Sequence, residues 1–427
     1  ASVPAGLRQG LAALDRLDRS NPGNEFIRAT LLLYLEEAVL ALEAVESAAA
    51  MFGDSEPERA IVAHGRTQPL AAVGRSTEAI ADGRAALRFA QQTAGMPGAP
   101  LPVTAAAHSL AATLQQSLFP AEAWDAAMLA LESSTATDDE PSTRIAEFRL
   151  GFAALDAGRL DDAARWFREA RSGAMSIGPA SLVVPSTAML AITVLSQGDV
   201  GAAEQLLAEI PSGIAEDPPQ RVARALVAAH HDRRDEARER LLAHAREATG
   251  RGYLALTEQY LHWITRFVDA AAAAEEYAAL PAAEPFAVPA RHARAEAAGD
   301  RRELEAVADE WERRGALLWA AEALTSASRA ALAEGDPRRA ATLQTRVDRL
   351  LEHCGGAATP LLARPVVEAA GLTAREREIA ALAARGLSSK QIADELFLSS
   401  RTIDNHLRSI YMKLDVRSRR ELTEALS

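Results

Sequence analysis

Along most of the chain, apolar residues recur at the spacing of a helix. From about Leu7 to Leu351 they fall three and four residues apart, and short Gly-Asp, Gly-Arg or Pro breaks separate the runs. Alternation of apolar and polar residues, which would indicate strands, is missing from this range. The pattern therefore predicts an all-α architecture.

Several of these breaks resemble one another. A glycine followed by Asp or Arg stands at Gly158, Gly198, Gly299 and Gly335. The first two glycines are 40 residues apart in the numbering, and the last two are 36 apart. Periods of this length are typical of stacked helical hairpins. We therefore expect an α-solenoid, with an irregular Ala-rich helical domain as the alternative.

One unit resembles a tetratricopeptide repeat. Its Leu-Gly, small, aromatic and Ala positions are occupied by Leu150, Gly151, Ala163, Phe167 and Ala170. The final proline of that motif is replaced by Met175, and the other units match more loosely. The resemblance implies a tetratricopeptide-like α-solenoid over residues 1–353. A Gly- and Pro-rich linker over residues 354–370 would follow, and a separate domain over residues 371–427.

The last domain shows a different pattern of short helices. Thr373 and Glu376 can form a capping box for a first helix, and Ser388 can cap a short second one. A tight turn at 398–400 precedes a third helix, from about Arg401 to Lys413, and a fourth is expected from about 418 to 426. The apolar positions expected to form the core are Ile379, Leu382, Ala383, Ile392, Ala393, Leu396, Ile403, Leu407, Ile410 and Leu414.

The third helix has a polar outer face. Two short helices joined by a tight turn, the second with such a face, fit the major groove of DNA. Asn pairs with adenine, Arg pairs with guanine, and Asp accepts a hydrogen bond from cytosine. We predict base contacts from Asp404, Asn405 and Arg408. We predict phosphate contacts from Lys390, Arg401, Thr402 and Lys413.

The whole tail resembles the LuxR-type helix-turn-helix. The resemblance rests on four segments spread over about 55 residues, at 372–378, 386–393, 400–407 and 413–419. It implies a four-helix domain that binds double-stranded DNA as a homodimer. The last helix of such domains often forms the dimer contact. Asp404 stands where Lys or Arg is frequent in that family, and Asp415 where Gly is usual. Asp404 therefore either reads a base or only positions Arg408 or Arg401.

Charge is unevenly distributed between the two parts. The net charge is −13. Residues 371–427 carry 10 Lys and Arg against 8 Asp and Glu, which leaves 36 basic and 51 acidic residues in the rest. The acidic part should repel DNA, whereas the tail should not. Both lysines of the chain, Lys390 and Lys413, lie in the tail.

The region before residue 371 contains no lysine, which excludes two kinds of domain from this part of the chain. A phosphorylation receiver resembles an α/β sheet with an essential lysine, and a P-loop needs a lysine for the phosphates. Helical repeats before a LuxR-type tail instead resemble the C-terminal half of the large ATP-binding regulators of that family. No catalytic or metal-ligand spacing is evident, so we expect neither an enzyme nor a cofactor.

The remaining features concern location and sensing. A single cysteine, Cys354, and no secretory pattern indicate the cytoplasm. The uncharged stretches 89–121 and 172–198 are interrupted by prolines, so we expect no membrane span. They could line a solenoid cavity. We expect four tryptophans to be core residues, and the alternative is that they form the wall of this cavity: Trp166, Trp263, Trp311 and Trp319.

Together these observations predict a bacterial transcription regulator that binds specific DNA sequences. Its helical repeats would sense a small effector or a protein partner. The alternative is a helical-repeat scaffold whose tail mainly mediates protein contacts.

Overall fold

The computed structural model describes two compact units, residues 1–362 and 363–427. The described residues are 3–17, 21–176, 180–213, 215–280, 286–363, 374–384, 387–396, 398–414, 416, 418 and 421–422. Within them all regular structure is helical, which confirms the predicted all-α class. None of their helices is long and apolar enough to cross a membrane.

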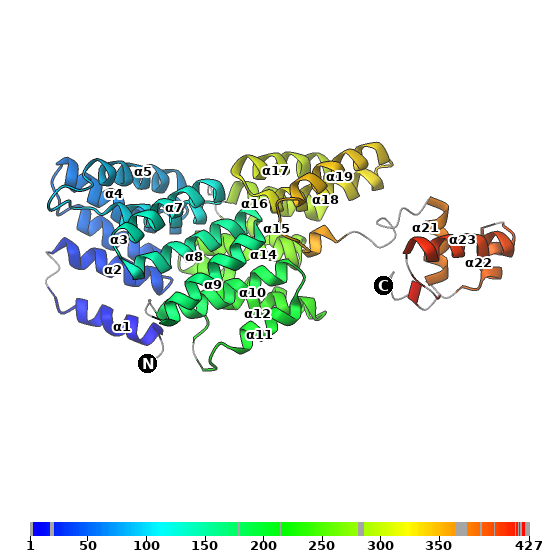
Figure 1. The fold of residues 1–427 in the computed structure, drawn as a ribbon, viewed down its shortest axis with the longest axis horizontal. Helices are drawn as coiled ribbons and strands as arrows, with labels where there is room; N and C mark the ends of the chain where they lie inside the picture. Colours follow the sequence, from blue (N-terminus) through cyan, green and yellow to red (C-terminus); the bar gives the residue numbers. More distant parts are fainter. Residues whose placement is uncertain are drawn as a thin grey trace. The chain divides into compact units, whose positions relative to one another are not determined.

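The described part of the first unit is a series of α-helices of 9 to 18 residues (Figure 1). In its first half the helices are α1 Val3–Leu14, α2 Pro22–Tyr34, α3 Ala38–Ala49, α4 Glu56–Ala72, α5 Ser76–Gln92, α6 Val103–Gln116, α7 Pro120–Ala136, α8 Glu140–Ala157 and α9 Leu160–Ser176. In its second half they are η1 Ala180–Leu182, α10 Val183–Ser196, α11 Val200–Ala208, α12 Pro218–His230, α13 Arg234–Gly250, α14 Leu254–Phe267, α15 Ala270–Ala279, α16 Ala287–Ala298, α17 Arg301–Arg314, α18 Leu317–Ala333, α19 Pro337–Leu351 and η3 Pro360–Leu362.

Consecutive helices pack as hairpins that stack on one another. α4 packs with α5, α6 with α7, α8 with α9, and α18 with α19. Alternate helices also touch, as α4 does with α6 and α6 with α8. Figure 1 shows α4 beside α5, α8 beside α9, and α18 beside α19. The predicted tetratricopeptide-like α-solenoid is confirmed.

The Gly-Asp breaks are the turns inside the hairpins. Gly158, Gly198, Gly299 and Gly335 follow α8, α10, α16 and α18, and all have positive φ, between 63° and 86°. A residue without Cβ adopts this left-handed conformation at little cost, so the helix can stop there. After three of these glycines the next residue is an aspartate that caps the following helix: the Asp199 side chain, for example, accepts a hydrogen bond from the Ala202 N–H at 2.9 Å.

The unit that resembles a tetratricopeptide repeat packs as its motif requires. Phe167 of α9 is fully buried and lies directly against Gly151 of α8. A Cβ added at Gly151 would stand 2.6 Å from two ring carbons of Phe167. The rings of Phe148 and Phe152 meet Phe167 edge-on, each with centroids 5.8 Å away. The glycine therefore sets how closely the two helices approach.

The array curls so that helices distant in sequence meet around α14. This helix contacts α4, α6, α12, α16 and η3 as well as its neighbours α13 and α15. The α2–α3 turn reaches the same region: Glu36 pairs with Arg221 of α12 at 3.2 Å, and Arg251 donates to the Leu35 carbonyl at 3.2 Å. α14 is consequently buried along most of its circumference.

The segment directly after α19 packs on the solenoid as far as residue 362, within the stretch 354–370 that the sequence predicts as a linker. Cys354 is fully buried, and its Sγ would stand 3.2 Å from a Cβ at Gly158. The Ala358 N–H donates to the Ser196 carbonyl at 2.8 Å, and Thr359 is buried. The composition of this stretch indicated a flexible connection, but the backbone groups of Gly355 and Ala358 find partners at the α10–α11 turn. Residues 364–370 lie outside the described residues.

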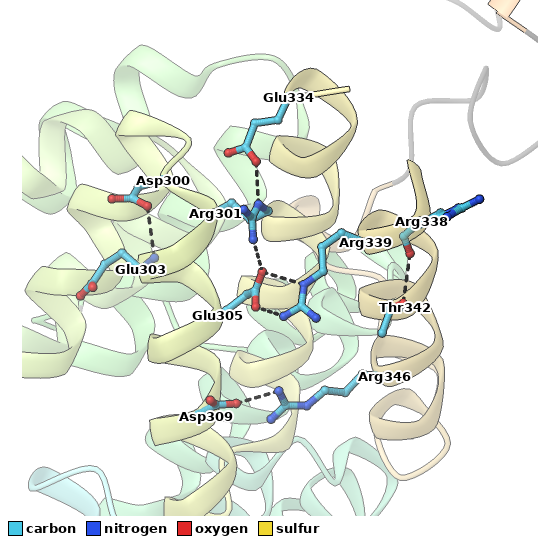
Figure 2. A network of polar contacts seen from close by, with 10 residues as sticks. All are labelled: Asp300, Arg301, Glu303, Glu305, Asp309, Glu334, Arg338, Arg339, Thr342 and Arg346. Atoms are coloured by element: carbon cyan, nitrogen blue, oxygen red, sulfur yellow. Dashed lines mark hydrogen bonds and ion pairs between the residues drawn. The ribbon is translucent and has the colours of Figure 1, made fainter. Parts of the chain in front are cut away.

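Ion pairs join the last two hairpins (Figure 2). Glu305 of α17 accepts from Arg301 at 2.8 Å and from Arg339 of α19 at 3.1 Å. Arg301 also donates to Glu334, after α18, at 2.7 Å, and Arg346 of α19 lies 2.7 Å from Asp309 of α17. These contacts cross between helices, so they hold the packing of α17, α18 and α19 in one register.

The second unit contains α21 Ala374–Ala384, α22 Ser389–Glu395 and α23 Ser400–Leu414. One apolar cluster holds it together, formed by Ile379, Ala380, Leu382, Ala383, Ile392, Ala393, Ile403, Leu407, Ile410 and Leu422. The core positions predicted from the sequence are thus confirmed, apart from Leu396, which is half-buried, and Leu414, whose side chain lies outside the described set.

Candidate nucleic-acid interface

α22 and α23 form a helix-turn-helix whose two starts are capped by serine. The Ser388 N–H donates to Gln391 Oε1 at 2.9 Å, and the Gln391 N–H donates to Ser388 Oγ at 3.4 Å, so the expected cap is a reciprocal capping box. The Leu398 N–H then bonds the Ala393 carbonyl at 2.9 Å and closes the turn. Ser399 Oγ accepts from the Thr402 N–H at 3.1 Å and so caps α23.

α23 divides cleanly into an inner and an outer face. Ile403, Leu407 and Ile410 are buried against α21 and α22. The residues of the predicted stripe are exposed: Arg401, Asp404, Asn405, Arg408 and Met412. Their spacing of three and four places them along one side of the helix, opposite the core. The outer face therefore presents two basic groups, one amide, one carboxylate and a thioether in a single row.

Two of the predicted base-contacting residues already lie against each other. Arg408 Nη1 donates to Asn405 Oδ1 at 3.4 Å. Within the described structure, no hydrogen bond or ion pair joins Asp404 to Arg401 or Arg408. No contact in the described structure therefore supports the interpretation that Asp404 positions one of those arginines.

The predicted phosphate-contacting residues lie near the helix starts, with one exception. Lys390 is exposed in the first turn of α22, and Arg401 is exposed in the first turn of α23. Thr402 is half-buried, and its hydroxyl lies 2.7 Å from Ser399 Oγ. Helix N-termini present free N–H groups and a positive partial charge, which favours phosphate.

Lys413, the exception, is exposed but forms an ion pair within the domain. Its ammonium lies 2.7 Å from Oε2 of Glu376, a residue of α21 that is only 4% exposed. Ser409 donates to the other oxygen of that carboxylate at 2.7 Å. The sequence indicated Glu376 as a capping partner of Thr373, which lies outside the described residues. The role it missed is a buried carboxylate that ties α23 to α21 and so fixes the direction of the outer face.

A second hydrogen bond joins α21 to the turn between α22 and α23. Arg375 donates to the Leu396 carbonyl at the end of α22 at 2.9 Å, while its other nitrogen pairs with Glu378 at 2.6 Å. With Glu376, it attaches α21 to both helices of the motif, so the outer face of α23 is presented on a rigid three-helix support.

A comparison with known protein families agrees with the helix-turn-helix described above. The model of the bacterial regulatory proteins of the luxR family matches residues 370–426. These residues form a LuxR-family DNA-binding domain. The resemblance of the tail to the LuxR-type helix-turn-helix is thereby confirmed.

Curated relatives of the LuxR-family domain match that part of the chain. A putative HTH-type transcriptional regulator of Mycobacterium bovis is 43% identical over 61 residues, which cover 14% of this chain and 7% of the relative. The transcriptional regulatory protein LiaR of Bacillus subtilis is 35% identical over 89 residues, which cover 21% of this chain and 38% of LiaR. The spore germination protein GerE of Bacillus subtilis is 44% identical over 48 residues, 11% of this chain and 65% of GerE. The chain therefore spans only a small part of the mycobacterial relative.

Solved structures resemble the solenoid weakly. The apo form of RapI is 12% identical with a TM-score of 0.37, covering 77% of this chain and 99% of that one. This similarity is too low to assign the solenoid to a family. Two expectations about the LuxR-family domain, the dimer contact of its last helix and the effect of Asp415, fall on or next to residues outside the described set.

Proposed function

We propose that this protein regulates transcription by binding a specific DNA sequence through the outer face of α23, as a homodimer. The observation that carries the proposal is the exposed row that includes Asn405 and Arg408, on a helix whose other face is buried. Asn405 and Arg408 would read adenine and guanine, and Asp404 a cytosine amino group. Lys390, Arg401 and Thr402 would hold phosphates. Lys413 would do so only if its ammonium left Glu376.

We further propose that the solenoid senses a small effector or a protein partner and changes the DNA affinity of the tail. This part is supported by the buried position of α14, on which distant helices converge. A site on that helix would contact both the early and the late hairpins. The alternative is a scaffold whose tail mediates protein contacts.

A mobility-shift titration of the full chain on DNA selected from a random duplex library tests the DNA proposal. Replacing Arg408 with Ala should weaken the selected site by about 1–3 kcal/mol and relax preference at one base pair. Replacing Lys390 with Ala should weaken all sequences alike and reduce the slope of log affinity against log salt by about 1. Arg338→Ala is the matched control, since this exposed arginine of α19 loses the same charge outside the LuxR-family domain.

The salt dependence separates the two functions. A protein that neutralises phosphates releases counterions, so its affinity must fall steeply as salt rises. Equal and salt-independent binding of selected and unselected DNA would favour the scaffold. The sedimentation mass of the complex with the selected duplex should correspond to two protein chains, and a mass with one chain would contradict the homodimer.

A further inference from the structure

The interior of the solenoid contains a polar cavity beside α14. It is lined by residues of α6, α8, α10, α12, α14 and α18 and is not fully enclosed. Its volume of about 30 Å³ has room for roughly two water molecules. The residues that matter here are Asp156, Glu258, His262, Trp263 and Trp319. The expectation that the two uncharged stretches line a cavity is also met, by Gln115 and Leu118 of the first and by Met189 and Ile192 of the second.

Several polar groups of this cavity have no partner. Glu258 is 1% exposed, and its Oε1 makes no hydrogen bond. His262 is 4% exposed, and neither of its ring nitrogens makes one. Asp156, a half-buried acid of the same cavity, also makes no hydrogen bond or ion pair within the described structure. Burying such groups unpaired costs free energy that a fold normally avoids, and here two of them, Glu258 and His262, line one cavity.

The nearby protein cations are engaged elsewhere. Arg266, one turn after His262 on α14, forms a two-point ion pair with Glu322 at 2.6 and 3.0 Å. Arg266 acts on Asp156. Arg314, the cation that acts on Glu258, donates to Glu310 at 2.8 Å. The two carboxyl groups of the cavity are therefore not neutralised by a contact within the protein.

The protonation of these groups follows from their surroundings. Burial raises the pKa of Asp156 to about 7, and burial together with Asp156 raises the pKa of Glu258 well above its usual value. Burial lowers the pKa of His262, and the charge of Arg266 lowers it further, so the ring is neutral at pH 7. The cavity thus offers carboxyl oxygens, an imidazole lone pair and indole walls.

We propose that this cavity binds the ammonium group of a small organic amine. An ammonium group donates three hydrogen bonds and is attracted to carboxylates and to aromatic faces, which is the set of groups present. The open side leaves room for the organic part of the ligand. A hard divalent cation would need six or more oxygen ligands, and no group of three or more potential metal ligands occurs in the described part of the chain.

Binding should release a proton. The ligand enters as R–NH₃⁺, and a carboxyl group of the cavity that is protonated in the free protein ionises to pair with it, giving its proton to the buffer. The amine keeps all its bonds. The effector role of this site rests on the proposed function above, whereas amine binding itself does not.

The test uses the full chain with methylammonium, n-butylammonium and putrescine as probes. n-Butanol serves as the neutral analogue of n-butylammonium, and KCl at equal ionic strength controls for a simple cation effect. Thermal stability, emission of the cavity tryptophans and calorimetry in two buffers of different ionisation enthalpy are measured. We expect at least one amine to raise the melting temperature and to release protons, while n-butanol and KCl do neither.

Two glutamine variants locate the site. Glu258→Gln should reduce amine affinity at least tenfold, while the free protein melts at the same or a higher temperature because an unpaired buried acid is gone. Glu147→Gln is the matched control: Glu147 is also buried, with a pKa raised to about 7 by burial, but it lies outside the cavity. It should leave amine binding unchanged.

The outcomes separate the site from the function. Absence of a response to every amine, an equal response to n-butanol or KCl, or full amine binding by Glu258→Gln would overturn the proposal. A mobility shift with and without amine then completes the test. Amine binding that leaves DNA affinity unchanged would overturn only the effector role, and specific DNA binding without any amine response would overturn only the amine site.

Discussion

The buried ion pair between Arg266 and Glu322 gives the sharpest prediction of stability. Arg266 of α14 is 2% exposed and Glu322 of α18 is 0% exposed, and two hydrogen bonds join them. Thr359 donates to Glu322 Oε1 at 2.6 Å and so attaches the end of the solenoid to the pair. The rings of Trp263 and Trp319 lie within 5.6 Å of the guanidinium carbon.

The expected loss of stability depends on which buried charge or hydrogen-bonding group each variant leaves without a partner. Glu322→Gln removes the charge that neutralises Arg266, and an uncompensated buried cation costs about 3–5 kcal/mol. Thr359→Val removes one hydrogen bond to a charged acceptor, worth about 1.5–3 kcal/mol. Replacing both Arg266 and Glu322 with Met removes the two buried charges together, so its cost should be smaller than that of Glu322→Gln alone.

Urea unfolding of the full chain, followed by tryptophan emission, measures these differences. All five tryptophans lie before residue 320, so the emission reports only on the solenoid. The matched control is Glu122→Gln, which breaks the half-exposed pair of Glu122 with Arg84 and should leave the midpoint nearly unchanged. A loss below about 1 kcal/mol for Glu322→Gln, or a double Met variant less stable than the single one, would refute the reasoning.

Two further predictions concern the hairpins. Gly151→Ala should cost about 1–3 kcal/mol because its Cβ would overlap Phe167, whereas Gly250→Ala, with nothing within 4 Å, should be neutral or stabilising; urea midpoints that did not differ would contradict this. Burial alone would raise the pKa of Glu305, but hydrogen bonds and charges from Arg339 and Arg301 outweigh it and lower the pKa below 4.5. Its stabilisation is therefore present above about pH 4.5 and is lost as the pH falls through the lowered pKa. Glu305→Gln should melt at a lower temperature than the native protein at pH 7 and at the same temperature in acid. A difference in melting temperature that does not change with pH would contradict the assignment.

What the sequence predicted well depends on neighbours close along the chain. A glycine that stops a helix and an aspartate that caps the next are visible as the dipeptide at Gly198 and Asp199. The contact of Gly151 with Phe167 spans only the two helices of one hairpin. The helix-turn-helix is equally local, because Ser388 caps α22 and the apolar spacing of α23 determines which face is exposed.

What could not be predicted depends on the curl of the whole array. Glu258, His262 and Arg266 stand four residues apart, a spacing typical of a polar stripe that faces solvent. In the structure the stripe is buried, because α14 is enclosed by helices from both ends of the solenoid. The partner of Arg266 is 56 residues away at Glu322, and that of Arg221 is 185 residues away at Glu36. Sequence spacing carries no information on such contacts.

The position of the cavity on α14 bears on how sensing could work. His262 lies one helical turn from Arg266, whose partner Glu322 also holds Thr359, close to the last described residues of the solenoid. The bound ammonium and the carboxylate that ionises with it would change the electrostatic field at the guanidinium of Arg266 and so alter its balance with Glu322. An effector can shift an equilibrium only by interacting differently with two states. The structure contains the bonded state of Thr359 with Glu322, and we propose that a weakened ion pair would release it. The Thr359→Val variant therefore mimics release without touching the cavity, so it should bind amines normally while its DNA affinity no longer responds to them.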